Sequence, residues 1–91
     1  MVNITWDEPK RQAVLRERGF DLLRAGLILD GHVLLTEDKR YDYGETRQVA
    51  IGQIEGEYYT VVFTKRGNAF HIITAWRAGR RARKRHQERF P

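Results

Sequence analysis

A basic stretch near the C-terminus, residues 65–81, combines residue types that can cleave RNA without a metal ion. It reads KRGNAFHIITAWRAGRR. Such cleavage requires a base for the 2′-hydroxyl proton, an acid for the leaving 5′-oxygen, and cations that stabilise the extra negative charge on phosphorus. Arginine suits the last task because its planar guanidinium donates a fork of hydrogen bonds. Histidine suits proton transfer because its unperturbed pKa is about 6.5.

The side chains of this stretch are predicted to converge at one edge of a β-sheet. Arg66 stands at a hairpin turn, His71 lies on the following strand, and Arg77 is expected in the first turn of a C-terminal helix. The predicted catalytic residues are Arg66, His71, Thr74 and Arg77. For His71, the alternative to a catalytic role is a strand residue that faces solvent. Trp76 either stacks on a base or covers the end of the sheet.

Positive charge is concentrated at the C-terminus. Residues 1–76 contain 10 Lys or Arg and 11 Asp or Glu, whereas residues 77–91 contain 7 and 1. Clustered cations favour nucleic acids because neutralised phosphates release their counterions, although such runs are often only solvated helix surface. The predicted nucleic-acid-binding residues are Lys65, Arg80, Arg81, Lys84 and Arg85.

Several classes of site and location are disfavoured by composition. The chain has no cysteine, its three histidines are scattered without ligand spacing, and no glycine-rich loop precedes a helix. A metal site or a cofactor is therefore not expected. No stretch approaches the roughly 20 apolar residues of a membrane span, and no signal peptide opens the chain, so we expect a soluble cytoplasmic protein.

The 91 residues are expected to form one domain, 1–91, that opens with two helices. Asp7 can cap a helix over residues 8–18, Pro9 is tolerated in its first turn, and Gly19 ends it. Asp21 can cap a second helix, which the LDGH segment ends. The pair is predicted to be an αα-hairpin.

Four short strands and a final helix follow in the predicted fold. Apolar alternation and turn residues place the strands at residues 32–36, 47–54, 57–64 and 69–74. Their short links predict an antiparallel meander. From Ala75 onward a helix is expected, with a thin seam at Ala78, Ala82, His86 and Phe90. The prediction is an α+β fold with two N-terminal helices, a four-stranded antiparallel sheet and a C-terminal helix.

The loop at residues 36–47, TEDKRYDYGETR, is dense in charged side chains and tyrosine. Such composition usually marks a solvated connection, since exposed salt pairs contribute little stability. The alternative is a loop of fixed shape, in which Tyr43 packs inward and four charged side chains hold one another: Asp38, Arg40, Glu45 and Arg47.

Four segments, taken in order, resemble the BrnT family of bacterial type II toxins: ITWDEPKRQ, RERGFDLLRA, EDKRYDYGETRQVAIG and VVFTKRGNAFHIITAWRA. The resemblance implies a RelE-like fold and a metal-independent ribonuclease toxin. It also implies inhibition by a BrnA-like antitoxin whose DNA-binding part lets the hetero-oligomer repress its own operon. The matching positions include Trp6, Asp7, Lys10, Gly19, Asp38, Arg40, Tyr43, Gly44, Glu45, Arg47, Thr64, Arg66 and Gly67, which favours the shape-setting loop.

Some positions depart from the family pattern. Glu17 and Arg18 replace a Lys-His pair, and Val14 replaces an Asn. The family signature RIISAR reads HIITAW here, with His71 and Trp76 in place of arginines. Two hypotheses follow: a working nuclease whose site is rebuilt around His71, Arg66 and Arg77, or a catalytically weakened homologue that binds an antitoxin or RNA.

Overall fold

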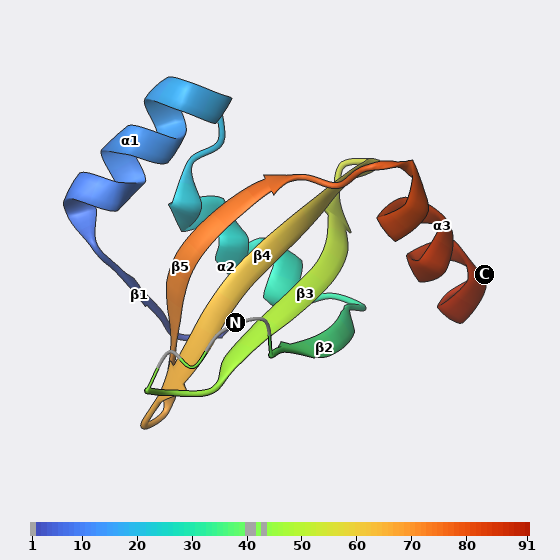
Figure 1. Ribbon diagram of the computed structural model, residues 1–91. Coiled ribbons are helices and arrows are strands. Elements are labelled where there is room, and N and C mark those ends of the chain that lie inside the picture. Colours follow the sequence, from blue (N-terminus) through green and yellow to red (C-terminus); the bar gives the residue numbers. More distant parts are fainter. Residues whose placement is uncertain (1, 40–41, 43) are drawn as a thin grey trace.

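Five strands form one mixed sheet in the computed structural model, which describes residues 2–39, 42 and 44–91 (Figure 1). The strands lie in the order β1-β5-β4-β3-β2, and their bounds are β1 Ile4–Trp6, β2 Leu34–Asp38, β3 Arg47–Ile54, β4 Glu57–Arg66 and β5 Ala69–Arg77. Strands β2 to β5 form the predicted antiparallel meander. The prediction of only four antiparallel strands is wrong, because β1 adds a parallel strand beside β5.

The helices confirm the α+β class and correct one element. Helix α1 spans Glu8–Arg18 as predicted, and Gly19 ends it in the left-handed conformation (φ 69°). The predicted second helix is a 3₁₀ turn, η1 Leu22–Arg24, followed by the short helix α2 Ala25–Leu29. Helix α3 spans Arg80–Arg89. No helix among the described residues is long and apolar enough to cross a membrane.

The core lies between one face of the sheet and the N-terminal helical segments. Alternate residues of the central strands point into it, since successive strand side chains face opposite ways. The buried apolar cluster consists of Val14, Phe20, Leu22, Ala25 and Ile28 from the helical part, and Ala50, Ile54, Val61, Phe63, Ile72 and Ala75 from the strands.

Strand β5 extends three residues beyond the predicted end. The β4–β5 register passes from Val62↔Thr74 to Phe63↔Ile72, which makes Ile73 the extra residue of a β-bulge. Beyond the strand, the Ala78 N–H donates to the Tyr58 carbonyl oxygen at 2.9 Å and continues the contact with β4. The predicted placement of Arg77 in a helical turn is therefore wrong: it is the last residue of β5, and α3 begins only after Gly79.

Aromatic and imidazole rings hold α3 against the sheet. His86 is buried, and its Nε2 donates to the His32 carbonyl oxygen at 2.8 Å. The Phe90 ring lies 5.2 Å from the His32 ring and 4.9 Å from the His86 ring, measured between centroids. Tyr58 contacts His86 edge-on. His86 and Phe90 thus belong to the predicted seam, whereas Ala78, its predicted first member, lies before α3 begins.

Asp21 ties α1 to the 3₁₀ turn. The Arg11 guanidinium donates to both carboxylate oxygens, Nε to Oδ1 at 2.8 Å and Nη2 to Oδ2 at 2.9 Å. The carboxylate also accepts from the Leu23 N–H at 3.0 Å. Hydrogen bonding from Arg11 lowers the pKa of Asp21, and the Leu23 bond lowers it further against the opposing effect of burial. Arg11 is held between this carboxylate and Glu8.

Asp21→Asn is expected to destabilise the fold by about 1 kcal/mol at neutral pH, because the amide keeps an oxygen for the Leu23 N–H but loses the ion pair. A carboxyl whose folded-state pKa is lowered stabilises the fold above its unfolded pKa, and this stability is lost as pH falls through the folded pKa. The difference in free energy of unfolding between the wild type and Asp21→Asn should therefore become smaller from pH 7 towards about pH 2. Urea unfolding of both proteins across this pH range measures this difference. A difference that does not change with pH would contradict a lowered pKa of Asp21 in the folded state.

Candidate active site

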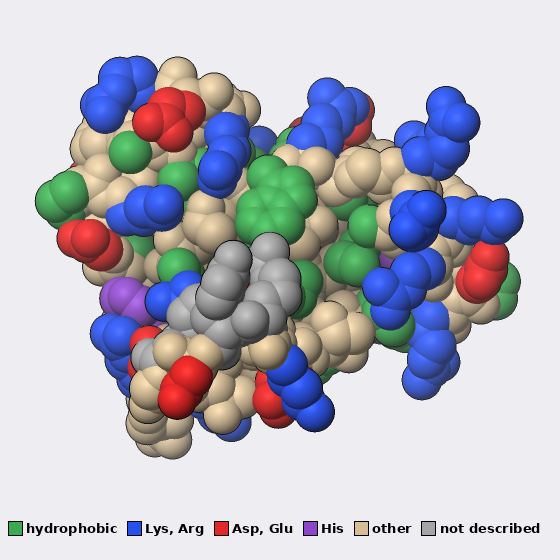
Figure 2. Space-filling view, in the orientation of Figure 1, with side chains coloured by type: hydrophobic (Ala, Val, Ile, Leu, Met, Phe, Trp, Pro, Cys, Tyr) green, Lys and Arg blue, Asp and Glu red, His purple; other side chains and the backbone are tan. Residues whose placement is uncertain are grey.

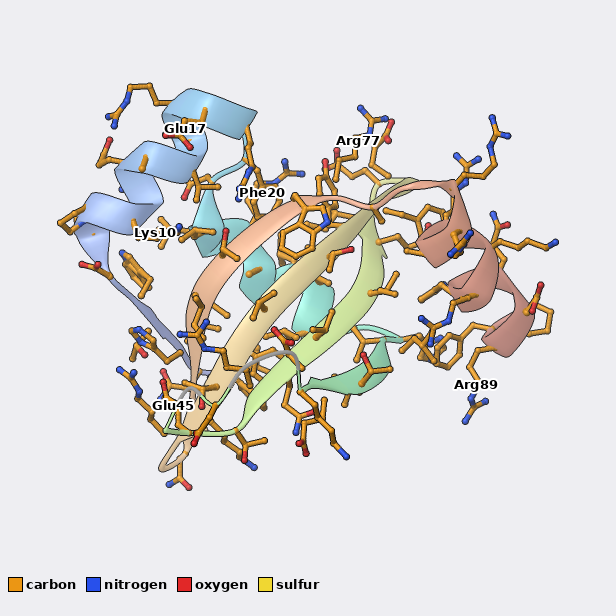
Figure 3. All side chains as sticks on the ribbon, viewed as in Figure 1. Lys10, Glu17, Phe20, Glu45, Arg77 and Arg89 are labelled. Carbon is orange, nitrogen blue, oxygen red and sulfur yellow. The ribbon has the colours of Figure 1, made fainter. Side chains whose placement is uncertain are left out.

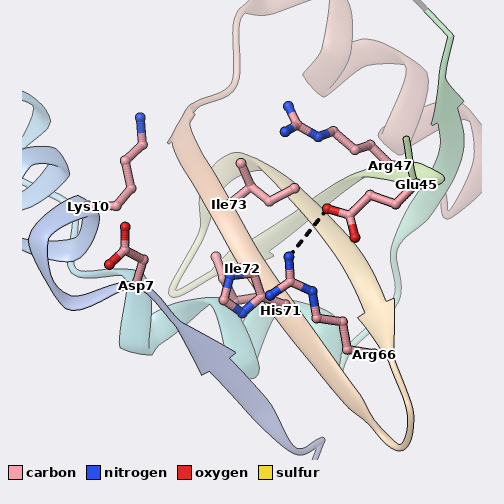
Figure 4. Close-up of a pocket in the computed structure, with 8 residues that line it drawn as sticks. All are labelled: Asp7, Lys10, Glu45, Arg47, Arg66, His71, Ile72 and Ile73. Atoms are coloured by element: carbon pink, nitrogen blue, oxygen red, sulfur yellow. Dashed lines mark hydrogen bonds and ion pairs between the residues drawn. The ribbon is translucent and has the colours of Figure 1, made fainter. Parts of the chain in front are cut away.

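A pocket of about 410 Å³ lies where the N-terminal end of α1 meets β3, β4 and β5 (Figure 4). Its apolar lining comes from Ile72 and Ile73 of β5. Three cations, two carboxylates and one imidazole surround this lining: Lys10, Arg47, Arg66, Asp7, Glu45 and His71. The excess of cations and the presence of proton-transfer groups suit a phosphate-containing ligand.

The β4–β5 hairpin brings Arg66 and His71 together. In the register of the two strands, Thr64 is opposite His71 and Arg66 is opposite Ala69. The short turn at Gly67 and Asn68 therefore places the arginine and the histidine two positions apart on neighbouring strands. Their predicted convergence is confirmed, since both line the pocket.

The Glu45 carboxylate forms an ion pair with the Arg66 guanidinium. Arg66 Nη2 lies 3.3 Å from Glu45 Oε1, drawn as the dashed line in Figure 4. The Arg66 side chain is 55% exposed, and ion pairs of this kind contribute little stability. An anionic ligand can therefore displace the carboxylate from Arg66 at small cost.

His71 is fixed by β1, the strand that the sequence did not reveal. Thr5 is opposite His71 in the parallel β1–β5 register. Thr5 Oγ1 lies 2.8 Å from His71 Nδ1. The imidazole is half-buried and lines the pocket, so it is accessible from solvent while one ring nitrogen is held by Thr5.

Two of the predicted catalytic residues lie outside the pocket lining. Arg77 is six positions beyond His71 on β5, about 20 Å along an extended strand, and forms an ion pair with Glu57. The predicted convergence of Arg66, His71 and Arg77 is therefore wrong for Arg77. The Thr74 hydroxyl accepts a hydrogen bond from Arg18 Nη1 at 2.8 Å, and the same nitrogen donates to the Ala75 carbonyl oxygen at 3.2 Å.

The predicted nucleic-acid-binding residues fall into two separate regions. Lys65 is the second-last residue of β4, so its side chain faces away from that of Arg66. Its Nζ lies 5.6 Å from the centroid of the Phe70 ring. The others belong to α3, where Figure 2 shows Lys and Arg side chains gathered at the right of the view and Figure 3 shows them projecting from the helix. These are Arg80, Arg81, Lys84 and Arg85, all exposed.

Four polar pocket residues were missed as site residues by reasoning from the sequence: Asp7, Lys10, Glu45 and Arg47. The signal that could have identified them was their match to the family pattern. In the loop at residues 36–47, Asp38 is buried and Glu45 contacts Arg66. Arg47, a further predicted member of the loop network, lines the pocket, and the last two, Arg40 and Tyr43, lie outside the described residues.

Within the described part of the chain, no group of three or more His, Asp or Glu side chains is arranged to hold a metal ion. The chemistry that the pocket residues themselves can supply is proton transfer at an imidazole or carboxylate, and charge stabilisation by guanidinium and ammonium groups.

Comparison with known proteins gives one family. A family model described as "Ribonuclease toxin, BrnT, of type II toxin-antitoxin system" matches residues 6–86, which is most of the chain. The match includes every residue of the pocket. A search of curated proteins found no match.

Proposed function

The chain belongs to the BrnT family of ribonuclease toxins of type II toxin–antitoxin systems, and from this membership we propose that it is a working endoribonuclease. It cleaves RNA without a metal ion and is neutralised by a BrnA-like antitoxin that carries a DNA-binding domain. The observation that carries this proposal is the shared pocket of Arg66 and His71, with two further cations at Lys10 and Arg47.

The proposed reaction is an attack by the ribose 2′-oxygen on the adjacent phosphorus. The 2′-hydroxyl loses its proton to a base, the bond from phosphorus to the 5′-oxygen breaks, and an acid protonates the leaving oxygen, which yields a 2′,3′-cyclic phosphate. We assign the two proton transfers to His71 and to the Glu45 carboxylate, which lies beside Arg66; Asp7 is the other carboxylate of the pocket. Arg66, Arg47 and Lys10 stabilise the extra negative charge on phosphorus.

Arg77 and Thr74 take no part in the chemical steps, since each has a partner outside the pocket. The site is instead rebuilt around the imidazole of His71, which stands where the family signature has an arginine. Helix α3 adds affinity by contacting the RNA backbone through Arg80, Arg81, Lys84 and Arg85. Lys65 adds positive charge near the end of β4, outside the pocket lining.

A second candidate function is a weakened toxin that only binds an antitoxin or RNA. The observation that favours this second function is that Arg77 lies outside the pocket lining and that Trp76 stands where the family signature has an arginine. Neither residue therefore supplies a guanidinium to the pocket. Losing one such donor can remove several kcal/mol of transition-state stabilisation.

Expression of the chain alone in a bacterium distinguishes the two functions. A working toxin should arrest growth, and co-expression of the antitoxin encoded beside it should restore growth. Arg66→Ala, expressed to the same level, is the matched control and should not arrest growth. Unimpaired growth with the wild-type chain would favour the binding module, and equal arrest by wild type and Arg66→Ala would place the toxicity outside the pocket.

A further inference from the structure

The hydrogen bond between Thr5 and His71 joins the pocket to a residue that has no other evident role. Thr5 is the middle residue of β1 and is exposed, so its hydroxyl is not needed to satisfy a buried group. The contact is nevertheless short, 2.8 Å from Oγ1 to the ring nitrogen Nδ1. An exposed hydrogen bond of this kind adds little to stability, and its effect is to fix the direction of the ring.

The neighbours of Thr5 hold its backbone in place. Ile4 packs against the buried core, and the Trp6 indole N–H donates to Glu8 Oε1 at 2.9 Å. At the start of the strand, the Phe70 N–H donates to the Asn3 carbonyl oxygen at 2.8 Å. The Thr5 hydroxyl is thus presented to His71 from a fixed strand rather than from a loose terminus.

A hydroxyl is suited to a histidine that must gain and lose a proton. It can donate to Nδ1 when that nitrogen carries a lone pair, and it can accept from Nδ1–H when the ring is the other tautomer or is protonated. The contact therefore persists in each state of the ring. It leaves Nε2 for a ligand, since Nε2 has no hydrogen-bond partner among the described residues.

We propose that Thr5 is a positioning residue that holds the His71 imidazole by Nδ1, so that Nε2 is the nitrogen that exchanges a proton with RNA in the pocket. The inference rests on the proposed ribonuclease function and adds β1 to the catalytic apparatus. A hydrogen bond to one ring nitrogen of a histidine determines which nitrogen is left to do the chemistry.

The kinetic test compares Thr5→Val with Thr5→Ser. Valine keeps the β-branched shape that suits a strand but lacks the hydroxyl, whereas serine keeps the hydroxyl. Thr5→Val is expected to lower the single-turnover rate at saturating RNA by about tenfold with unchanged RNA affinity, and Thr5→Ser should stay within about twofold of wild type. In a His71→Ala background, Thr5→Val should have no further effect. A further loss in that background, or an equal loss in both variants, would overturn the proposal.

Nitrogen NMR of the His71 ring without RNA gives a readout that does not depend on cleavage. Thr5→Val should shift the Nδ1 resonance, because that nitrogen loses its hydrogen-bond partner, and Thr5→Ser should preserve the wild-type spectrum. Identical ring spectra in wild type and Thr5→Val would overturn the positioning role even if RNA is cleaved. Altered spectra in a protein that cleaves no RNA would support the contact and refute the ribonuclease function instead.

Discussion

Replacing Arg66 with alanine is expected to lower the single-turnover rate of RNA cleavage at saturating RNA by about a hundredfold, the usual effect of removing one donor to a developing negative charge. In the free protein the guanidinium contacts Glu45 at 3.3 Å and is more than half exposed. It is thus available to a phosphate that replaces the carboxylate. Arg66→Lys should lose less than alanine, because it keeps the charge without the planar fork.

Arg77→Ala is the matched control for this prediction. It removes the same charge from an exposed ion pair at the other end of the sheet, and Arg77 lies outside the pocket. Its cleavage rate should stay within about twofold of wild type. A double substitution of Lys84 and Arg85 by alanine should weaken RNA binding and flatten its salt dependence while leaving the saturated rate unchanged. Equal losses in Arg66→Ala and Arg77→Ala would show that the pocket does not contain the catalytic arginine.

Gly52→Ala is expected to destabilise the fold by about 2 kcal/mol, the usual cost of overpacking a core. A Cβ atom at Gly52 on β3 would lie 2.8 Å from Ile28 Cγ2 and 3.0 Å from Val33 Cγ1. Ile28 is 1% exposed in the core, and the clashing methyl branches directly from its Cβ. It cannot swing aside as the end of a flexible chain would, so α2 must move away from the sheet. Urea unfolding followed by circular dichroism measures the loss.

Gly31→Ala serves as the comparison for this substitution. A Cβ atom there would meet its nearest neighbour, the Ile28 carbonyl oxygen, at 3.6 Å, which is ordinary contact. Its effect on the free energy of unfolding should stay within about 0.5 kcal/mol. If both alanine variants unfolded at the same urea concentration, close packing of α2 on β3 would not be the reason for glycine at position 52.

The parts of the fold that the sequence predicted are those with a strong local signal. Helix α1 has Pro9 at its start and Gly19 at its end, and β3 and β4 each contain a run of apolar, β-branched and aromatic residues next to a tight turn. Strand β1 has only three residues, too few for a periodic pattern, and its pairing with β5 depends on a contact 66 residues away in the chain. Strand β5 continues beyond its predicted end because a bulge at Ile73 lets both Ile72 and Ala75 reach the core.

The candidate site was predictable only where neighbouring residues in the chain form it. A two-residue turn joins β4 to β5, so Arg66 and His71 had to lie near each other once the hairpin was recognised. Lys10 enters the pocket because β1 places the start of α1 beside β5, and that arrangement has no local signature. Arg77 was predicted to lie in a helix because helix-forming residues follow it in the sequence, whereas it is the last residue of β5.

The most direct test of the account is the cleavage of a defined RNA by purified wild-type protein in EDTA, with the ends of the products identified by mass spectrometry. Attack by the 2′-oxygen under the control of Arg66 and His71 predicts 2′,3′-cyclic phosphate and 5′-hydroxyl ends, formed by wild type and nearly absent with Arg66→Ala. Intact RNA, or products that end in a 3′-hydroxyl and a 5′-phosphate, would contradict it.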